Sequence, residues 1–142
     1  MAINNKFIYT LFVGILATSI TPPAMAEQDE NGYNINITAS ETTINESSLL
    51  FNQTPFSNNY IAARIDGSGH DISVEQQGYD NYALIDTQGS NNSAKIEQQS
   101  YGNFASITQN GQNNIASIVQ NSANNFASIT QNGSGNFASI KQ

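Results

Sequence analysis

The side chains best able to do chemistry in this sequence are a single histidine, His70, and eleven carboxylates, among which Glu75 and Glu97 are regularly spaced. These two glutamates are 22 residues apart and would stack on one sheet of a repeating structure, where a carboxylate pair could bind a cation. The sequence implies no third ligand and no pocket, so we interpret both as edge charges that restrain aggregation. We interpret His70 as a turn residue whose titration would make early assembly sensitive to pH.

An enzyme or a metal protein requires more than these groups. A solenoid enzyme would need convergent acids or a nucleophile beside a base, and the sequence shows neither. We therefore predict no enzyme activity, no catalytic residue, no metal ligand, no cofactor and no nucleic-acid partner. The chemistry that the sequence repeats is hydrogen bonding by side-chain amides, together with burial of aliphatic groups.

Amide and aliphatic residues recur with a period of eleven, which indicates stacked copies of one short element. Each unit begins with an asparagine, at Asn81, Asn92, Asn103, Asn114, Asn125 and Asn136. An isoleucine follows four residues later, at Ile85, Ile96, Ile107, Ile118, Ile129 and Ile140. A glutamine closes each unit except at Thr87, and these are Gln76, Gln98, Gln109, Gln120, Gln131 and Gln142. We predict that these residues form an amyloid-like core with ladders of hydrogen-bonded amides.

Each unit reads Asn-x-Ala-x-Ile-x-Gln, followed by a turn that contains Gly or Ser. In an extended strand alternate residues share a face, so Asn, Ala, Ile and Gln point one way. Charged residues such as Asp86 and Lys95 occupy the other face, which indicates that it meets solvent. A spacing of two fits a helix badly. The sequence therefore predicts an all-β fold, a β-solenoid of about four 22-residue coils, each made of two 11-residue strand-turn units.

The solenoid is predicted to occupy residues 60–142. Residues 48–53 would begin a degenerate first repeat that is completed around residues 63–65. The interval from Ala63 to Ile72 is nine residues instead of eleven, which predicts a shortened or bulged turn there.

The N-terminal part lacks the repeat. Residues 1–26 contain Lys6, an apolar run over residues 7–17 and the A-x-A pattern of residues 24–26, which together predict a secretory signal peptide. The apolar run is too short to span a membrane, which takes about 20 residues. Residues 27–59 are predicted to form a disordered, flexible segment. Since the chain has no Cys, an exported protein must be stabilised by packing and hydrogen bonds.

An uncapped solenoid whose coils match one another can add a second molecule end to end and form a fibre. Only 11% of the residues are charged, all acidic residues lie at or before Glu97, and Lys141 is the only charged residue after it. The stretch 98–140 has strong β character and no Pro, which is typical of cross-β assembly. We predict that the C-terminal repeats are the templating end.

Outward-facing apolar residues also repeat. They predict two columns that could serve lateral packing of fibres, or that reflect β propensity alone. The columns are Tyr82, Phe104 and Phe126 on one sheet, with Ile115 and Phe137 on the other.

Repeats of the form Asn-x-Ala-x-Ile-x-Gln-x-Gly after a signal peptide resemble the curlin family, the subunits of bacterial curli amyloid fibres. The resemblance covers about residues 72–142. Residues 81–86 and 92–98 look most like the minor, nucleating subunit, in which nearly every half-repeat has the Ala-x-Ile form. Residues 137–142 depart from that subunit, which typically ends in a basic, divergent repeat. Residues 27–59 resemble the export-targeting segment of the family.

The resemblance implies a secreted structural subunit that leaves the cell through an outer-membrane export pore. It would nucleate extracellular fibres at the bacterial cell surface, made of itself and other curlin subunits, in adhesion and biofilm formation. One alternative is the major, bulk subunit. Another is a monomeric binding solenoid such as an ice-binding protein, which would need a flat outward Thr array, whereas only Thr108 and Thr130 are expected to stack.

Overall fold

The computed structural model describes residues 9–10, 35–39, 48–54 and 57–142, and within these ranges the chain forms strands and no helix. The N-terminal strands are β1 (Tyr9–Thr10), β2 (Ile35–Ala39) and β3 (Ser48–Gln53). The strands of the repeat are β4 (Tyr60–Ser68), β5 (Asp71–Gln76), β6 (Tyr82–Ser90), β7 (Ser93–Gln98), β8 (Phe104–Gln112), β9 (Ile115–Gln120), β10 (Phe126–Ser134) and β11 (Phe137–Lys141). The predicted signal peptide, apart from β1, lies outside the described residues.

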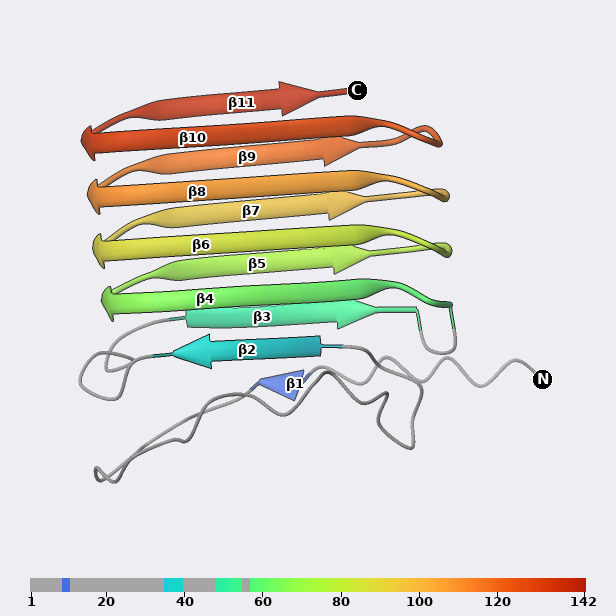
Figure 1. Ribbon diagram of the computed structural model, residues 1–142, viewed down its shortest axis with the longest axis horizontal. Coiled ribbons are helices and arrows are strands. Elements are labelled where there is room, and N and C mark those ends of the chain that lie inside the picture. The colour runs from blue at the N-terminus through green and yellow to red at the C-terminus, as the bar shows by residue number, and fades with distance from the viewer. Residues whose placement is uncertain (1–8, 11–34, 40–47, 55–56) are drawn as a thin grey trace.

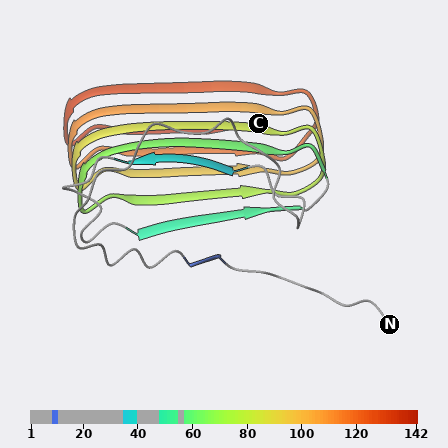
Figure 2. The ribbon, with the colours of Figure 1, turned by 60° about the horizontal axis from the view of Figure 1, so that its bottom comes forward.

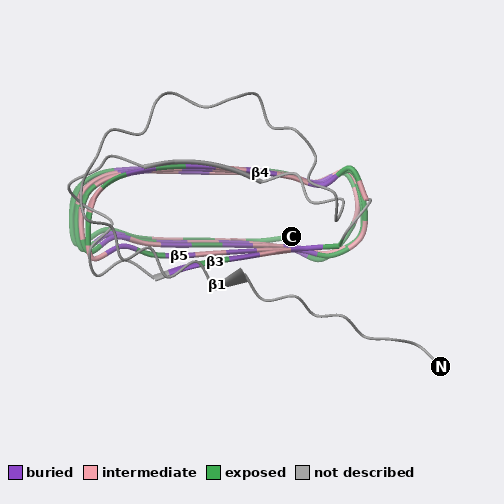
Figure 3. Ribbon diagram, turned by 90° about the horizontal axis from the view of Figure 1, so that it is seen from below, coloured by how far each residue is buried: buried purple, intermediate pink, exposed green. Residues whose placement is uncertain are grey.

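The strands stack into two sheets that face each other (Figure 1). Sheet A has the order β1-β3-β5-β7-β9-β11, and sheet B has the order β10-β8-β6-β4-β2. All pairs are parallel except β1 with β3, and the register repeats identical residues, as where Ile107 pairs with Ile129. Figure 3 shows the coils from below as a flattened ring, and Figure 2 shows the same stack tilted. The predicted β-solenoid of stacked 22-residue coils is confirmed.

The two strands of a coil differ in length. Those of sheet B from β4 to β10 have nine residues, whereas β5, β7 and β9 have six. A glycine near the end of each nine-residue strand has a positive φ, which is 111° at Gly89. A Cβ added there would lie 1.9 Å from the carbonyl oxygen of Gly111 on the next coil, so this corner requires glycine. The eleven-residue units therefore alternate in shape although they share one sequence pattern.

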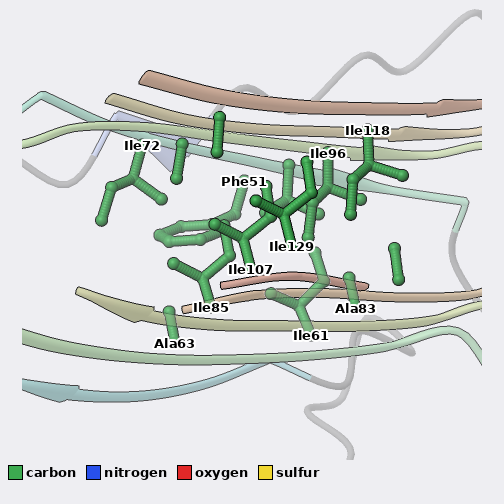
Figure 4. Packing of buried hydrophobic residues seen from close by; sticks show 14 of the residues in the cluster. Phe51, Ile61, Ala63, Ile72, Ala83, Ile85, Ile96, Ile107, Ile118 and Ile129 are labelled. Atoms are coloured by element: carbon green, nitrogen blue, oxygen red, sulfur yellow. The ribbon is translucent and has the colours of Figure 1, made fainter. Parts of the chain in front are cut away.

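The core lies between the two sheets. Alternate residues are buried along each strand, as Ala105, Ile107 and Gln109 are in β8, and the residues between them face outward. The isoleucines of β6, β8 and β10 point toward those of β7 and β9 (Figure 4). The predicted inward face of Ala, Ile, Asn and Gln is therefore the buried one, and parallel stacking covers it with the same residues from neighbouring coils.

The predicted shortened turn before Ile72 is wrong. Ile61 pairs with Ala83, and Ala63 pairs with Ile85, so Ile61 occupies the alanine position of the repeat. The interval from Ile61 to Ile72 is the regular eleven residues. Residue identity aligns Ala63 with the alanines of the later repeats. The core requires only a fixed apolar volume, which one Ile and one Ala fill in either order.

Two strands that pair in parallel with the repeat, β2 and β3, lie before residue 60, the predicted start of the solenoid. Within β3, Gln53 pairs with Gln76 of β5, and Ile35 of β2 pairs with Ile61 of β4. The predicted flexible segment 27–59 therefore contains strands of both sheets, and its role in export stays a prediction. In the described part of the chain, no helix is long and apolar enough to cross a membrane.

Candidate functional site

The asparagines lie at the inner corners of the coils, where each closes a turn and contacts the next coil. The backbone N–H of Asn103 donates to Oδ1 of Asn81 at 3.1 Å, and its Nδ2 donates to the carbonyl of Gln99, four residues earlier, at 2.8 Å. Nδ2 of Asn81 likewise donates to the carbonyl of Gln77 at 3.2 Å and to that of Ser100, one coil further, at 3.1 Å. Because the side chain is buried and each amide makes several of these bonds, loss of one amide would leave several polar groups unpaired.

On sheet A the glutamines form a continuous ladder. Nε2 of each donates to Oε1 of the next at 2.8–3.1 Å, in the order Gln53, Gln76, Gln98, Gln120 and Gln142. Nε2 also reaches the carbonyl sixteen residues earlier on the facing sheet, as Gln98 does with Tyr82 at 3.1 Å. Each amide therefore joins successive coils and ties the two sheets together at one edge of the core.

On sheet B the glutamine ladder is interrupted. Gln109 donates to Gln131 at 2.9 Å, but the residues stacked before Gln109 are Thr87 and Ile65. Thr87 and Gln109 are both fully buried, and Thr87 Oγ1 and Gln109 Oε1 have no hydrogen-bond partner among the described residues. The ladder of sheet B therefore begins only at β8, so the two sheets carry unequal numbers of amide contacts.

His70 replaces an asparagine at the corner between β4 and β5. Its side chain is buried, and Nδ1 accepts the backbone N–H of Asn92 at 3.3 Å, as Oδ1 of Asn92 does for Asn114 at 3.0 Å. Nε2 lies 3.4 Å from the carbonyl oxygen of Asp66. Loss of hydration on burial lowers the pKa of His70 below its ordinary 6.5, although Asp66 and the backbone contacts oppose this. His70 thus takes the structural place of asparagine in its neutral form.

The last coil, β10 and β11, ends the stack at its C-terminal side (Figure 1). One coil earlier the predicted core residues are fully buried, namely Asn114, Ile118 and Gln120. Their counterparts in the last coil are exposed or half-buried, namely Asn136, Ile140 and Gln142. No described strand pairs with the outer edges of β10 and β11, which present backbone groups to a further strand.

The predicted aromatic column on sheet B is confirmed, with one further member. Ring centroids are separated by 4.6, 5.6 and 5.0 Å along Tyr60, Tyr82, Phe104 and Phe126. On sheet A, Ile115 pairs with Phe137 as predicted. Phe126 and Phe137 are 67% and 73% exposed, the largest values among the apolar side chains described. The most exposed apolar surface is therefore at the open coil.

The stacked carboxylates do not assemble a metal site. Glu75 and Glu97 pair in register, as predicted, but each has its own partner. Gln77 donates to Glu75 at 2.8 Å, and Lys95 lies 3.4 Å from Glu97. Within the described residues, no group of three or more His, Asp or Glu side chains is placed to hold a metal ion. Both glutamates face outward, where charges oppose lateral pairing.

Two ladder members were missed by sequence reasoning. Asn59 is buried, and its Oδ1 accepts the backbone N–H of Asn81 at 2.9 Å. Gln53 starts the ladder of sheet A through its bond to Gln76. A search at the full period of 22 residues would have found Asn59, because it precedes Asn81 by one coil. Gln53 precedes Gln76 by 23 residues, so a strict period does not reveal it.

A protein-family model, the curlin associated repeat, matches residues 67–99 and 122–142. These ranges cover the end of β4, all of β5, β6 and β7, and all of the last coil, β10 and β11. No match was found among curated proteins or among solved structures. Two matches to the curlin associated repeat, within a parallel solenoid of stacked amides, show that this chain carries curlin repeats and support its place in the curlin family.

Proposed function

We propose that this chain is the minor curli subunit, secreted to the cell surface, and that its last coil nucleates the polymerisation of other curlin subunits. The observation that carries the proposal is the open edge of β10 and β11. Its residues repeat those of the coil beneath it, yet every residue of β11 and every outward residue of β10 is left exposed or half-buried. An incoming coil with the same pattern would bury them in the same way and would extend both sheets.

The distribution of charge supports this polarity. After Glu97 the sequence has one charged residue, Lys141 in β11, so the open coil carries a single charge of the kind that restrains pairing of strand edges. The earlier coils carry outward acidic residues such as Glu75 and Asp86. An end whose only charged side chain is Lys141, together with an acidic end, favours head-to-tail addition over the association of like ends.

A nucleating role fits the way in which the chain folds. The first coils of a fibre are the least stable, because ordering the backbone costs entropy before stacking stabilises it. This chain stacks about four coils within one molecule, so it offers a formed template to a subunit that has none. The Ala-x-Ile form of its half-repeats, which resembles the minor subunit, supports the same assignment. Export through an outer-membrane pore, and roles in adhesion and biofilm, follow from family membership as part of the proposal.

The test is a time course of amyloid-dye fluorescence on residues 27–142 released freshly from denaturant. A trace amount is also added to a monomeric curlin major subunit. We expect self-assembly and loss of the lag of the major subunit. Self-assembly without an effect on that lag would assign the chain to the bulk of the fibre. A chain that stays soluble and dye-negative would contradict a fibre subunit of either kind.

The alternative of a monomeric ice-binding solenoid finds little support in the outer faces. Thr108 and Thr130 pair in register, but the residue stacked before Thr108 is Asp86, which lies 3.5 Å from Arg64. The column therefore changes from neutral to charged within the described coils, whereas an ice-binding face would need a regular Thr array.

A further inference from the structure

We propose that the solenoid holds one buried water molecule between Thr87 and Gln109, which completes the interrupted ladder of sheet B. This hydration site goes beyond the proposed function and does not depend on fibre formation. It is inferred from two fully buried polar side chains, on adjacent strands β6 and β8, whose oxygen atoms Thr87 Oγ1 and Gln109 Oε1 lack hydrogen-bond partners among the described residues. Buried polar atoms in native proteins are nearly always paired, by protein or by ordered water.

The intact ladder shows which groups a glutamine at position 87 would have satisfied. Each ladder glutamine donates one N–H to Oε1 of the next glutamine and the other to a carbonyl sixteen residues earlier, as Gln109 does with Ser93 at 2.9 Å. Asp71 pairs with Ser93 in register. A glutamine in place of Thr87 would therefore donate to Oε1 of Gln109 and to the carbonyl of Asp71. The threonine side chain has no amide, and the hydroxyl of Thr87 makes no hydrogen bond to either group.

A water molecule supplies the same two donors. It would donate to Oε1 of Gln109 and to the carbonyl of Asp71, and it would accept the hydroxyl proton of Thr87. Three such bonds are typical of a buried water, and the difference in length between threonine and glutamine leaves room beside the stacked side chains.

The chemistry of the site favours water over an ion. The preceding inward residues on β6 and β8 are the core isoleucines Ile85 and Ile107, and the amide of Gln109 is neutral. An unpaired cation would lose its hydration there without a carboxylate to offset the loss, since the side chain of Asp86 faces outward. A small neutral molecule that both donates and accepts satisfies all three groups.

The experiment measures transfer of proton polarisation from water to glutamine side-chain amides by solid-state NMR. It uses sedimented, 13C,15N-labelled full chain, whether monomeric or assembled. Gln98 is the internal control, because it is fully buried on sheet A and its Oε1 accepts from Gln76 at 2.8 Å. We expect transfer to the Gln109 amide to build up several-fold faster than transfer to Gln98. Equal rates at the two amides would overturn the proposal.

Two variants locate the water at Thr87. Thr87→Gln supplies the missing amide and is expected to reduce transfer at Gln109 to the rate at Gln98. Thr87→Val keeps the size of the side chain but removes the hydroxyl, and is expected to slow transfer at Gln109 at least twofold. Unchanged transfer at Gln109 in either folded variant would overturn the assignment. If Thr87→Gln fails to fold, the comparison of Gln109 with Gln98 in the wild type and the Thr87→Val variant still test the proposal.

Discussion

Strands β8 and β10 have the same sequence except at their last residue, yet they differ in environment. In β8 the inward residues are buried and the outward ones half-buried, whereas in β10 every outward residue is exposed. Between β9 and β11 the inward residues change as well, from buried to half-buried. The difference comes from position in the stack and not from residue type. The last coil is therefore a core coil without its neighbour. A strand that pairs with β10 as β10 pairs with β8 would meet the same residues.

The largest contrast is expected at the stacked glycines Gly111 and Gly133. A Cβ at Gly111 would lie 1.8 Å from the carbonyl oxygen of Gly133, whereas a Cβ at Gly133 meets only Nδ2 of Asn136 at 3.7 Å. Both have positive φ, so each Ala variant carries backbone strain of about 1–3 kcal/mol. We expect Gly111→Ala to lose clearly more stability, measured as a denaturant midpoint on monomer. Equal losses would mean that the coils do not stack as closely as described.

Truncation of an isoleucine should cost more stability in the buried coil than in the last coil. Ile118 is fully buried and Ile140 is half-buried one coil later. Ile118→Ala should cost about 2–5 kcal/mol, the range for buried isoleucine, and Ile140→Ala distinctly less. Unfolding of the two monomers in denaturant measures the difference. If Ile140→Ala were as costly, the last coil would already be covered, and the edge would not be open.

Glutamine substitutions compare the two ladders. Gln98→Ala leaves one N–H of Gln76 Nε2 and Oε1 of Gln120 without partners and removes a donor from the carbonyl of Tyr82, at about 1–3 kcal/mol for each buried group left unpaired. Gln109→Ala leaves Oε1 of Gln131 without a partner and removes a donor from the carbonyl of Ser93, but it strands no N–H and removes an unpaired oxygen, so we expect a smaller loss. Denaturant midpoints of both variants give the ranking. The reverse ranking would show that the sheet A ladder adds nothing beyond packing.

The ladder of sheet B should also affect assembly. We expect the double variant Gln109→Ala, Gln131→Ala to lengthen the lag before fibre growth, because the incoming coil loses the amide of Gln131 as a partner. Amyloid-dye fluorescence measures the lag. An unchanged lag would show that the amide ladders do not contribute to fibre growth.

The smallest effect is expected from pH at the first coil. The pKa of His70 is lowered in the fold, so the unfolded chain binds a proton more readily than the folded one. Stability is therefore fully present above the ordinary pKa of 6.5 and declines as pH falls below it. His70→Asn restores the amide of the repeat and should reduce the decline measured between about pH 7.5 and pH 5. An identical pH profile in both proteins would contradict this role.

Much of the fold follows from the sequence, because the period and the parity of charges decide which residues face inward. The columns of Asn81 and Gln98 could be predicted for this reason. The exchange of Ile61 and Ala63 could not, since volume is conserved over the pair and not at each site. Nor could the difference between Gln120 and Gln142, because identical residues differ only in what lies next to them.

The most direct test of the open edge uses two variants within the last coil. A Cβ at Gly133 meets little in the single molecule, but an incoming coil that continues the glycine column would place a carbonyl against it, as Gly133 does to Gly111. Gly135→Asn is the control, because Asn113 has a similar φ at the same position one coil earlier, 55° against 70°. The measurement is the lag of self-assembly by amyloid-dye fluorescence, on monomers first shown to be folded. We expect Gly133→Ala to lengthen the lag severalfold and Gly135→Asn to leave it near that of the wild type. Growth of Gly133→Ala at the wild-type rate would contradict templating by the C-terminal coil.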